Sequence, residues 1–388
     1  MIKTICLLGS TGSIGRNCLD VCKALSIYPK YMACGSNIKL FAEQILAFQP
    51  IKVAVASEKL AENLREILEE KTSQIPDILY GEEGRCELAG LSYDLHFAAM
   101  SGFAGLTAVL KALETGHNLA LANKESLVAA GKILMKLAHE KNCKIFPVDS
   151  EHSAIWQCLE GVPRENVRRL WLTASGGPFR RFTLDMMKEV TAADALRHPV
   201  WNMGAKISID SATMMNKGLE LIEAMHLFSR KEEEVEIIVH PEGAIHSLVE
   251  LEDGALIAQM GSADMRLPIQ LALTYPERVD GGWPRFDFLS YKNGLNFEAP
   301  DEVRFPSLRL AREAARHGDG LALVMNAANE VAVEAFLEGE ITFLSIAELT
   351  EKCMDYFLSQ EQLTLANAND IIQLDHEVRQ YCKKIFCS

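Results

Sequence analysis

Two acidic residues at the end of an expected strand have the chemistry of a metal site, and a separate stretch of the chain offers a further carboxylate. Asp149 and Glu151 follow an apolar segment, 144–148, with the pattern of a β-strand, and Glu220 lies in an amphipathic helical pattern. If the extended backbone persists past the strand, the first two carboxylates point to the same side. Carboxylate oxygens suit Mg²⁺ or Mn²⁺, and no cysteine or histidine partner indicates zinc. The alternative is that Asp149 or Ser150 only caps a helix.

The residues before Glu220 place three functional groups on one helical face. Asn216 precedes Glu220 by four residues and Lys217 precedes it by three, so the three side chains fall near one another on a helix. An amide, an ammonium group and a carboxylate together strengthen the case for a metal site. The same spacing also fits an ordinary lysine–glutamate pair on the surface of a helix.

Two loops have the composition of a phosphate site and of a lid. In Thr173–Pro178 a strand is followed by small residues with free backbone amides. Residues 198–204, HPVWNMG, set an aromatic side chain between proline and glycine, which is typical of a mobile lid. The alternative is a loop histidine at His198, with Trp201 and Met203 as a local hydrophobic plug.

A glycine-rich turn near the start of the chain predicts a dinucleotide site. Gly9, Gly12 and Gly15 follow the apolar strand 4–8 and precede an amphipathic segment. Glycines let the backbone approach a pyrophosphate, whose charge the helix N-terminus then meets. Hydroxyl groups within the turn would add contacts. The alternative is an ordinary tight turn between a strand and a helix.

The loop after the second strand favours NADPH over NADH. An NAD enzyme usually has Asp or Glu here, on the ribose 2′-hydroxyl. This chain has Gly35, Ser36 and Asn37 instead, with Lys39 close by and no carboxylate. A carboxylate would repel a 2′-phosphate, so its absence favours the phosphorylated cofactor.

The elements that must position these residues begin with a parallel sheet. Residues 1–149 alternate between short apolar runs and helical patterns, which implies crossover connections. We therefore expect an α/β fold with an N-terminal, Rossmann-like, doubly wound sheet that binds NADPH. The expected strands are Thr4–Leu8, Tyr31–Cys34, Val53–Ala56, Ile78–Tyr80, His96–Met100, Asn118–Leu121 and Lys144–Val148.

The pattern changes after residue 149. Residues 150–275 predict an α+β catalytic and dimerisation domain, with a hairpin turn at 252–254. Prolines and glycines mark 276–306 as a linker, and 307–388 predict a small helical domain. The expected strands are Leu170–Thr173, Ile207–Ile209, Val235–His240, Ile245–Leu251 and Leu256–Met260, and the expected helices are Leu308–Arg316, Ala322–Leu337, Ile346–Leu358 and about 368–384.

Composition excludes several kinds of partner. The formal net charge of −14 argues against nucleic acid and anionic membrane surfaces, which need a basic footprint. We find no apolar run of about 18 residues, and the N-terminus enters a strand directly, so we expect a cytoplasmic protein. The 10 cysteines form no C-x-x-C pair and are expected to be reduced thiols.

The combination of motifs resembles the 1-deoxy-D-xylulose 5-phosphate reductoisomerase family, in the same order and over nearly the whole chain. The 27-residue block at 198–224 is highly specific. The blocks that carry the resemblance are GSTGSIG at 9–15, ALANKES at 120–126, VDSEHSAIWQCL at 148–159, TASGGPFR at 173–180, HPVWNMGAKISIDSATMMNKGLELIEA at 198–224 and MNAANEVAVEAF at 325–336.

The resemblance implies a role for each matching residue. Asp149, Glu151 and Glu220 would hold one divalent cation. Lys124, Ser150 and Asn216 would contact the substrate hydroxyls and carbonyl. The phosphate pocket would consist of Ser175, Ser211, Asn216 and Lys217 with His198 beside it, and Trp201 and Met203 would form the lid. The implied NADPH contacts are Thr11, Gly12, Ser13, Ile14, Gly35, Ser36, Asn37, Asn123, Lys124, Glu125 and Gly204.

The implied activity is the NADPH- and metal-dependent conversion of 1-deoxy-D-xylulose 5-phosphate to 2-C-methyl-D-erythritol 4-phosphate. This is the committed step of the methylerythritol phosphate (non-mevalonate) route to isoprenoids. We expect retro-aldol cleavage and re-addition to give an aldehyde, which NADPH reduces. The resemblance also implies a homodimer in a bacterial cytoplasm, inhibited by phosphonate hydroxamates of the fosmidomycin type.

This sequence departs from the family pattern in a few places. Ser36 stands where Arg or Lys is common in the family. We hypothesise that Lys39 binds the 2′-phosphate of NADPH instead. Glu242 and Gly243 replace a usual Gln-Ser, and Ala263 replaces a proline. None of these positions is one of the metal carboxylates.

Two other functions remain open on the residues alone. One is a metal-independent dehydrogenase of the semialdehyde type, which begins with a similar glycine turn but uses an active-site cysteine. The other is an NADPH-binding regulatory protein with an inactive second site. The intact carboxylates and Lys217 argue against the latter.

Overall fold

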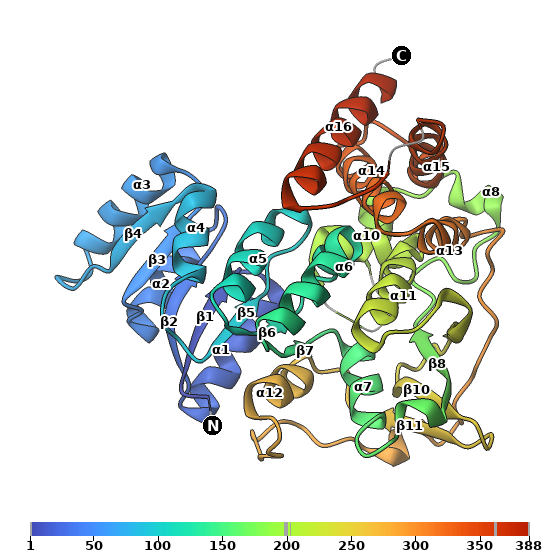
Figure 1. Cartoon of the computed structure of the whole chain (residues 1–388), viewed down its shortest axis with the longest axis horizontal. Coiled ribbons are helices and arrows are strands. Elements are labelled where there is room, and N and C mark those ends of the chain that lie inside the picture. Colours follow the sequence, from blue (N-terminus) through green and yellow to red (C-terminus); the bar gives the residue numbers. More distant parts are fainter. Residues whose placement is uncertain (1, 198–200, 202, 361–362, 387–388) are drawn as a thin grey trace. The chain divides into compact units, whose positions relative to one another are not determined.

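The computed structural model describes residues 2–197, 201, 203–360 and 363–386, and its chain forms two compact units (Figure 1). The first unit comprises Met1–Ser126, Leu134–Ser153 and Asp264–Pro284. The second comprises Leu127–Ile133, Ala154–Ala263 and Arg285–Ser388. These units group residues by contact, so the expected division by function at 149, 275 and 306 stays a prediction.

The first unit contains a seven-stranded, wholly parallel sheet in the order β4-β3-β2-β1-β5-β6-β7. The order reverses between β1 and β5, so the predicted doubly wound sheet is confirmed. The strands are β1 (Thr4–Leu8), β2 (Tyr28–Ala33), β3 (Lys52–Val55), β4 (Asp77–Tyr80), β5 (Leu95–Ala98), β6 (Asn118–Leu121) and β7 (Ile145–Pro147).

Helices connect these strands, as the alternating pattern predicts. They are α1 (Ser13–Leu25), α2 (Ile38–Phe48), α3 (Glu58–Glu69), α4 (Gly81–Ala89) and α5 (Leu106–Glu114), with the short η1 (Phe103–Gly105). The same unit also contains α12 (Arg266–Thr274), which follows β11 in the chain. One further helix, α6 (Lys124–Glu140), has residues in both units and a non-helical residue at Ala130.

Register puts the carboxyl ends of five strands at one level. Leu8 of β1 pairs with Ala33 of β2 and with Ala98 of β5. Ala98 pairs with Leu121 of β6, which in turn pairs with Pro147 of β7. The loops that follow these strands therefore leave the same edge of the sheet, which is where ligands bind in this architecture.

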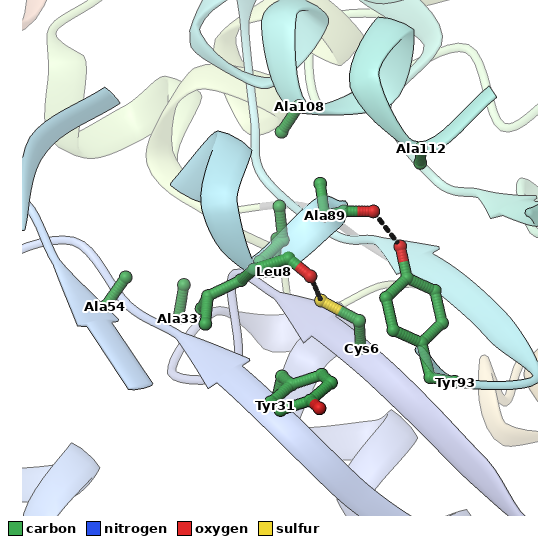
Figure 2. Close-up of a cluster of buried hydrophobic side chains, with 10 residues drawn as sticks. Cys6, Leu8, Tyr31, Ala33, Ala54, Ala89, Tyr93, Ala108 and Ala112 are labelled. Atoms are coloured by element: carbon green, nitrogen blue, oxygen red, sulfur yellow. Dashed lines mark hydrogen bonds between the residues drawn. The ribbon is translucent and has the colours of Figure 1, made fainter. Parts of the chain in front are cut away.

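Helices α4 and α5 pack on one face of the sheet through small side chains (Figure 2). Ala89 of α4 and Ala108 and Ala112 of α5 pack in a buried cluster with Leu8 and Tyr31 from the strands. Alanine adds little bulk, so helices can approach a sheet closely at such positions. The Tyr93 hydroxyl lies in this cluster and donates to the Ala89 carbonyl oxygen.

His96 is a buried, neutral histidine on β5. Its Nδ1 lies 3.1 Å from the Tyr93 oxygen. Because the Tyr93 hydroxyl gives its proton to Ala89, Nδ1 must donate to that oxygen, which leaves Nε2 unprotonated. Nε2 has no hydrogen-bond partner within the described residues. Burial lowers the pKa of His96 to about 3.

Burial of His96 predicts a loss of stability in acid. Its folded pKa lies below the unfolded value of about 6.5, so stability is full above that pH and declines as the pH falls toward 3. The decline reaches the order of a few kcal/mol. In urea titrations between pH 7 and 4, H96N should lose stability less steeply with falling pH than the wild type. The exposed H139N is the control, and equal slopes for wild type and H96N would contradict the assignment.

The second unit contains a four-stranded mixed sheet in the order β11-β10-β8-β9. The predicted hairpin between β10 and β11 is confirmed, with Gly254 at φ +86° in its turn. The strands are β8 (Val167–Ala174), β9 (Val235–Val239), β10 (Ile245–Leu251) and β11 (Leu256–Met260), and the helices before and between them are α7 (Ser150–Cys158), α8 (Leu184–Met187), α9 (Ala192–Ala195), α10 (Ala205–Ala212) and α11 (Met215–Phe228).

The expected strand Ile207–Ile209 is wrong, because these residues belong to helix α10. The alternation of isoleucine and serine has the period of a strand. Side-chain interactions at helical spacing favour the helix instead: Lys206 pairs with Asp210, and the Ser208 hydroxyl donates to the Gly204 carbonyl oxygen. Both Ser208 and Ile209 are buried, so tertiary packing overrides the local pattern.

The C-terminal part is helical, as predicted. The helices are α13 (Ser307–His317), α14 (Asp319–Leu337), α15 (Ser345–Leu358) and α16 (Ala368–Phe386), and α14 packs against the other three (Figure 1). By length and composition α14 could span a membrane, but 83% of its most apolar window is buried inside the protein. It is the core helix of this region.

Candidate active site

The glycine turn adopts a backbone that only glycine allows at two positions. Gly9 has φ +95°, and a Cβ there would lie 2.5 Å from the Ala99 carbonyl oxygen. A Cβ on Gly15 would lie 2.1 Å from the carbonyl oxygen of Gly9. The turn therefore folds tightly against the loop after β5, where the strand order reverses. No side chain caps α1 at Gly12, so its first amides are available to a phosphate.

The other residues of the first unit that are candidates to bind the cofactor lie in loops at the same edge of the sheet. Gly35, Ser36 and Asn37 are exposed after β2, and Asn37 caps α2 by accepting from the amide of Leu40 at 3.3 Å. Gly204 belongs to the second unit, where it precedes α10. The remaining candidates surround these loops: Thr11, Ser13 and Ile14 are half-buried beside Gly12, and Asn123, Lys124 and Glu125 follow β6.

The loop after β6 is held by its own hydrogen bonds. The Asn123 amide donates to the Gly102 carbonyl oxygen at 2.9 Å and to the Glu125 carboxylate at 3.0 Å. The Ser126 hydroxyl donates to the Asn123 side-chain oxygen. These contacts fix the start of α6 at the sheet edge, and with it Lys124.

Lys124 and Asp149 form a buried ion pair at the ends of neighbouring strands. Lys124 is the first residue of α6, after β6, and Asp149 lies between β7 and α7. The side chains are only 5% and 13% exposed. A carboxylate so far from water needs a compensating charge, and the ammonium group supplies it.

Glu151 does not continue the extended geometry expected after β7. The strand ends at Pro147 and α7 begins at Ser150, so Glu151 lies in the first helical turn. An anion is favourable there because the helix N-terminus is positive. The Ser150 hydroxyl donates to Glu151 at 2.5 Å. An oxygen of Asp149 and one of Glu151 still lie within 4.8 Å of each other, close enough to share a cation.

In the second unit, Glu220 is a buried carboxylate with two cationic or polar donors. The Asn216 amide donates to one of its oxygens and the Lys217 ammonium to the other. The side chains of Lys217 and Glu220 are 4% and 1% exposed, so the interpretation as a surface ion pair is wrong. All three residues lie in the first two turns of α11.

Three chain segments next to Lys217 form a candidate anion pocket. Gly177, at φ +68°, lies so close to α10 that a Cβ would be 2.5 Å from the Ser211 carbonyl oxygen. The loop after β8, which carries Ser175, therefore lies against the end of α10, and α11 begins three residues later. Hydroxyl groups and an ammonium group at a helix N-terminus are suited to a phosphate.

The candidate lid is described only in part. Trp201 and Met203 are half-buried, and the Trp201 ring centroid lies 6.2 Å from that of His246 at 47°. His198 lies outside the described residues. Gly204 then precedes α10, the helix that carries Ser211.

Sequence reasoning missed the group that holds α10 in place. Asp210 is 1% exposed, and its oxygens accept from Lys206 at 2.9 Å and from Asn329 of α14 at 2.7 Å. This buried contact joins the segment bearing Ser211 to the core helix of the C-terminal part. The signal was present in the block at 325–336, where Asn326 and Asn329 are spaced for one helical face.

The departures at 242 and 243 have a structural explanation. Gly243 has φ +60°, which favours glycine over serine. The Glu242 carboxylate accepts from the backbone amide of Asn296 at 3.0 Å and from its side chain at 2.6 Å, so it secures the segment 285–306. Nothing in the structure explains Ala263.

The sequence matches three family models that together cover most of the chain. They are the 1-deoxy-D-xylulose 5-phosphate reductoisomerase model over residues 5–131, its C-terminal domain model over 145–228, and the DXP reductoisomerase C-terminal domain model over 260–381. The reductoisomerase of Chloroherpeton thalassium is 46% identical, with 98% of this chain and 97% of that protein covered. That of Pelotomaculum thermopropionicum is 48% identical, with 99% and 98% covered. The chain belongs to the 1-deoxy-D-xylulose 5-phosphate reductoisomerase family.

Solved reductoisomerases share the fold of this family member. One, in complex with NADPH, fosmidomycin and magnesium, superposes with a TM-score of 0.95 at 38% identity, covering 99% of this chain and 98% of the other. Another, from Zymomonas mobilis in complex with NADPH, gives a TM-score of 0.90 at 42% identity, covering 100% and 99%. The resemblance expected from the motifs is confirmed.

Proposed function

We propose that this protein converts 1-deoxy-D-xylulose 5-phosphate, NADPH and a proton into 2-C-methyl-D-erythritol 4-phosphate and NADP⁺, in the methylerythritol phosphate route to isoprenoids. The observation that carries the proposal is a repeated one: a buried carboxylate in each unit is matched to a lysine, Asp149 to Lys124 and Glu220 to Lys217. Carboxylates paired with lysines offer ligands for both a cation and an anionic substrate. The family and its solved complexes support the assignment.

We infer that Asp149, Glu151 and Glu220 hold one Mg²⁺ or Mn²⁺ ion. The donor set fits, because it offers only carboxylate oxygens, which hard divalent cations prefer. When bound, the metal supplies Lewis-acid stabilisation of negative charge on substrate oxygens. Lys124 and Lys217 pair with two of these carboxylates, and metal binding would leave each ammonium group available to other anionic groups.

The anion pocket is proposed to take the substrate phosphate. Ser175 and Ser211 offer hydroxyl groups, Asn216 an amide and Lys217 a positive charge, and these groups also fit the phosphonate of a fosmidomycin-type hydroxamate. Holding the phosphate orients the reacting carbons and provides binding energy for closing a lid made by His198, Trp201 and Met203. Ser150 and Lys124 are proposed to contact substrate oxygens, with Lys124 placed to move a proton.

NADPH, which supplies the hydride, is proposed to lie along the carboxyl edge of the parallel sheet. Its pyrophosphate would meet the uncapped N-terminus of α1, and its 2′-phosphate the loop after β2. The residues proposed for these contacts are Thr11, Gly12, Ser13, Ile14, Gly35, Ser36, Asn37, Asn123, Lys124, Glu125 and Gly204.

One assay tests the activity and separates the alternatives. Purified protein is mixed with the ketose phosphate, NADPH and Mg²⁺, and the loss of reduced-nicotinamide absorbance is followed with and without EDTA. We expect turnover that EDTA abolishes and added Mg²⁺ restores. EDTA-resistant oxidation would favour the semialdehyde-type dehydrogenase, and NADPH binding without turnover would favour the regulatory protein.

Replacing Glu220 by Gln should lower turnover by roughly a hundredfold or more while NADPH binding is retained. A neutral amide removes one anionic ligand and with it part of the Lewis-acid stabilisation. Turnover is measured at saturating Mg²⁺, and NADPH binding by fluorescence titration. The exposed Glu233→Gln is the matched control, and normal turnover by E220Q would overturn the metal assignment.

Lys39 should supply the preference for NADPH that Ser36 does not. It is exposed in the first turn of α2, beside the loop after β2. K39A should weaken NADPH binding by roughly tenfold, the value of one exposed ion pair with a phosphate, and leave NADH binding unchanged. Fluorescence titrations with both nucleotides measure this, with K59A on α3 as the control. Equal losses for both nucleotides, or a wild-type preference for NADH, would reject the role.

We also propose a homodimer in the bacterial cytoplasm. Support comes from the second unit, where edge strand β11 exposes Leu256, and where Phe288 and Leu289 are 70% and 81% exposed. Exposed apolar side chains and an open sheet edge each favour association. Sedimentation equilibrium should return twice the chain mass of 43.0 kDa, and a monomer mass at micromolar concentration would contradict the dimer.

A further inference from the structure

Two cysteines on different helices of the C-terminal part face each other in the core. The sulfur of Cys353 on α15 lies 3.1 Å from that of Cys382 on α16, and the residues are 29 positions apart. Both are buried, at 0% and 2% exposure. An approach of about 1 Å would bring the two sulfurs to the covalent S–S length of roughly 2.05 Å.

The surrounding contacts hold the two helices in this register. Tyr381, next to Cys382, stacks on Tyr356 of α15 with ring centroids 4.0 Å apart and meets Phe357 edge-on at 5.8 Å. One turn earlier on α16, Arg379 binds Asp375 at 2.7 Å and Glu330 of α14 at 2.6 Å. Packing on both sides of the pair therefore fixes the thiols opposite each other, independently of either candidate site.

We propose that Cys353 and Cys382 are a reversible disulfide site that a peroxide oxidises and a small thiol reduces. Cys382 attacks first: its sulfur forms a bond to one peroxide oxygen, the O–O bond breaks, and a sulfenic acid and water result. The Cys353 sulfur then attacks the Cys382 sulfur and a second water leaves. In sum, two thiols and one hydrogen peroxide give one disulfide and two waters.

The order of attack follows from the environment of each thiol. The hydrogen bond between the two sulfurs lowers the pKa of Cys382, and the nearby Arg379 guanidinium acts in the same direction. The same interaction, together with burial, raises the pKa of Cys353. Cys382 therefore has the greater thiolate character. It lies in the last two turns of α16, and helix ends open locally, which admits a small oxidant.

A second close pair in the chain provides an internal contrast. Cys18 and Cys22 are buried on a single helix, α1, and interact with each other. A bond between them would join residues that are already one turn apart, whereas the Cys353–Cys382 bond would fasten α16 to α15. Only the latter constrains the unfolded chain over a long loop, so only it should raise the melting temperature appreciably.

The test uses the full chain. Protein is titrated with hydrogen peroxide, quenched, denatured in iodoacetamide and digested, and the peptides are mapped by mass spectrometry. We expect one cross-linked pair that contains Cys353 and Cys382, 2 Da lighter than the two thiol peptides together. The melting temperature should rise by several degrees and return on adding dithiothreitol.

The variants C353S and C353A separate this proposal from mere reactivity. Without its partner, oxidised Cys382 should persist as a sulfenic acid that dimedone labels, and the rise in melting temperature should disappear. C18S should behave as the wild type. If Cys353 and Cys382 remain fully alkylatable in the wild type at peroxide doses that oxidise other thiols, or if dimedone labels wild-type Cys382 without a cross-link, the site is refuted.

Discussion

The structure depends on pairing buried carboxylates with lysines in places where water is scarce. Asp149 and Glu220 are both largely removed from solvent, and each would be costly to bury alone. In each unit a lysine from the first turn of a helix, Lys124 or Lys217, neutralises the carboxylate. Both units therefore compensate a buried carboxylate with a lysine.

The backbone geometry determines the positions of these charged groups. The register of the parallel sheet brings the ends of β1, β2, β5, β6 and β7 to one level, so residues more than 100 positions apart share an edge. Gly9, Gly15 and Gly177 allow approaches that any Cβ would prevent. The turn after β1 and the loop after β8 therefore need glycine, because a side chain at these positions would collide with the neighbouring backbone.

Local patterns predicted the elements well where tertiary packing agreed with them. The strands Thr4–Leu8, Asn118–Leu121, Ile245–Leu251 and Leu256–Met260 end where their apolar runs end. The pattern failed at Ile207–Ile209, where alternation suggested a strand but helix α10 is fixed by Asp210 and its contact with Asn329 on α14. That contact joins residues 119 positions apart, which no local window can contain.

The sequence by itself determined the family and the doubly wound sheet and predicted which residues carry the chemistry, because glycine turns and carboxylates must occur at fixed places in the chain. The tertiary structure decided how these groups are used. It showed that Lys217 and Glu220 are buried, that Glu151 belongs to a helix and that Cys353 faces Cys382. Burial and the meeting of distant side chains follow from packing across the whole chain, so residue spacing alone does not reveal them.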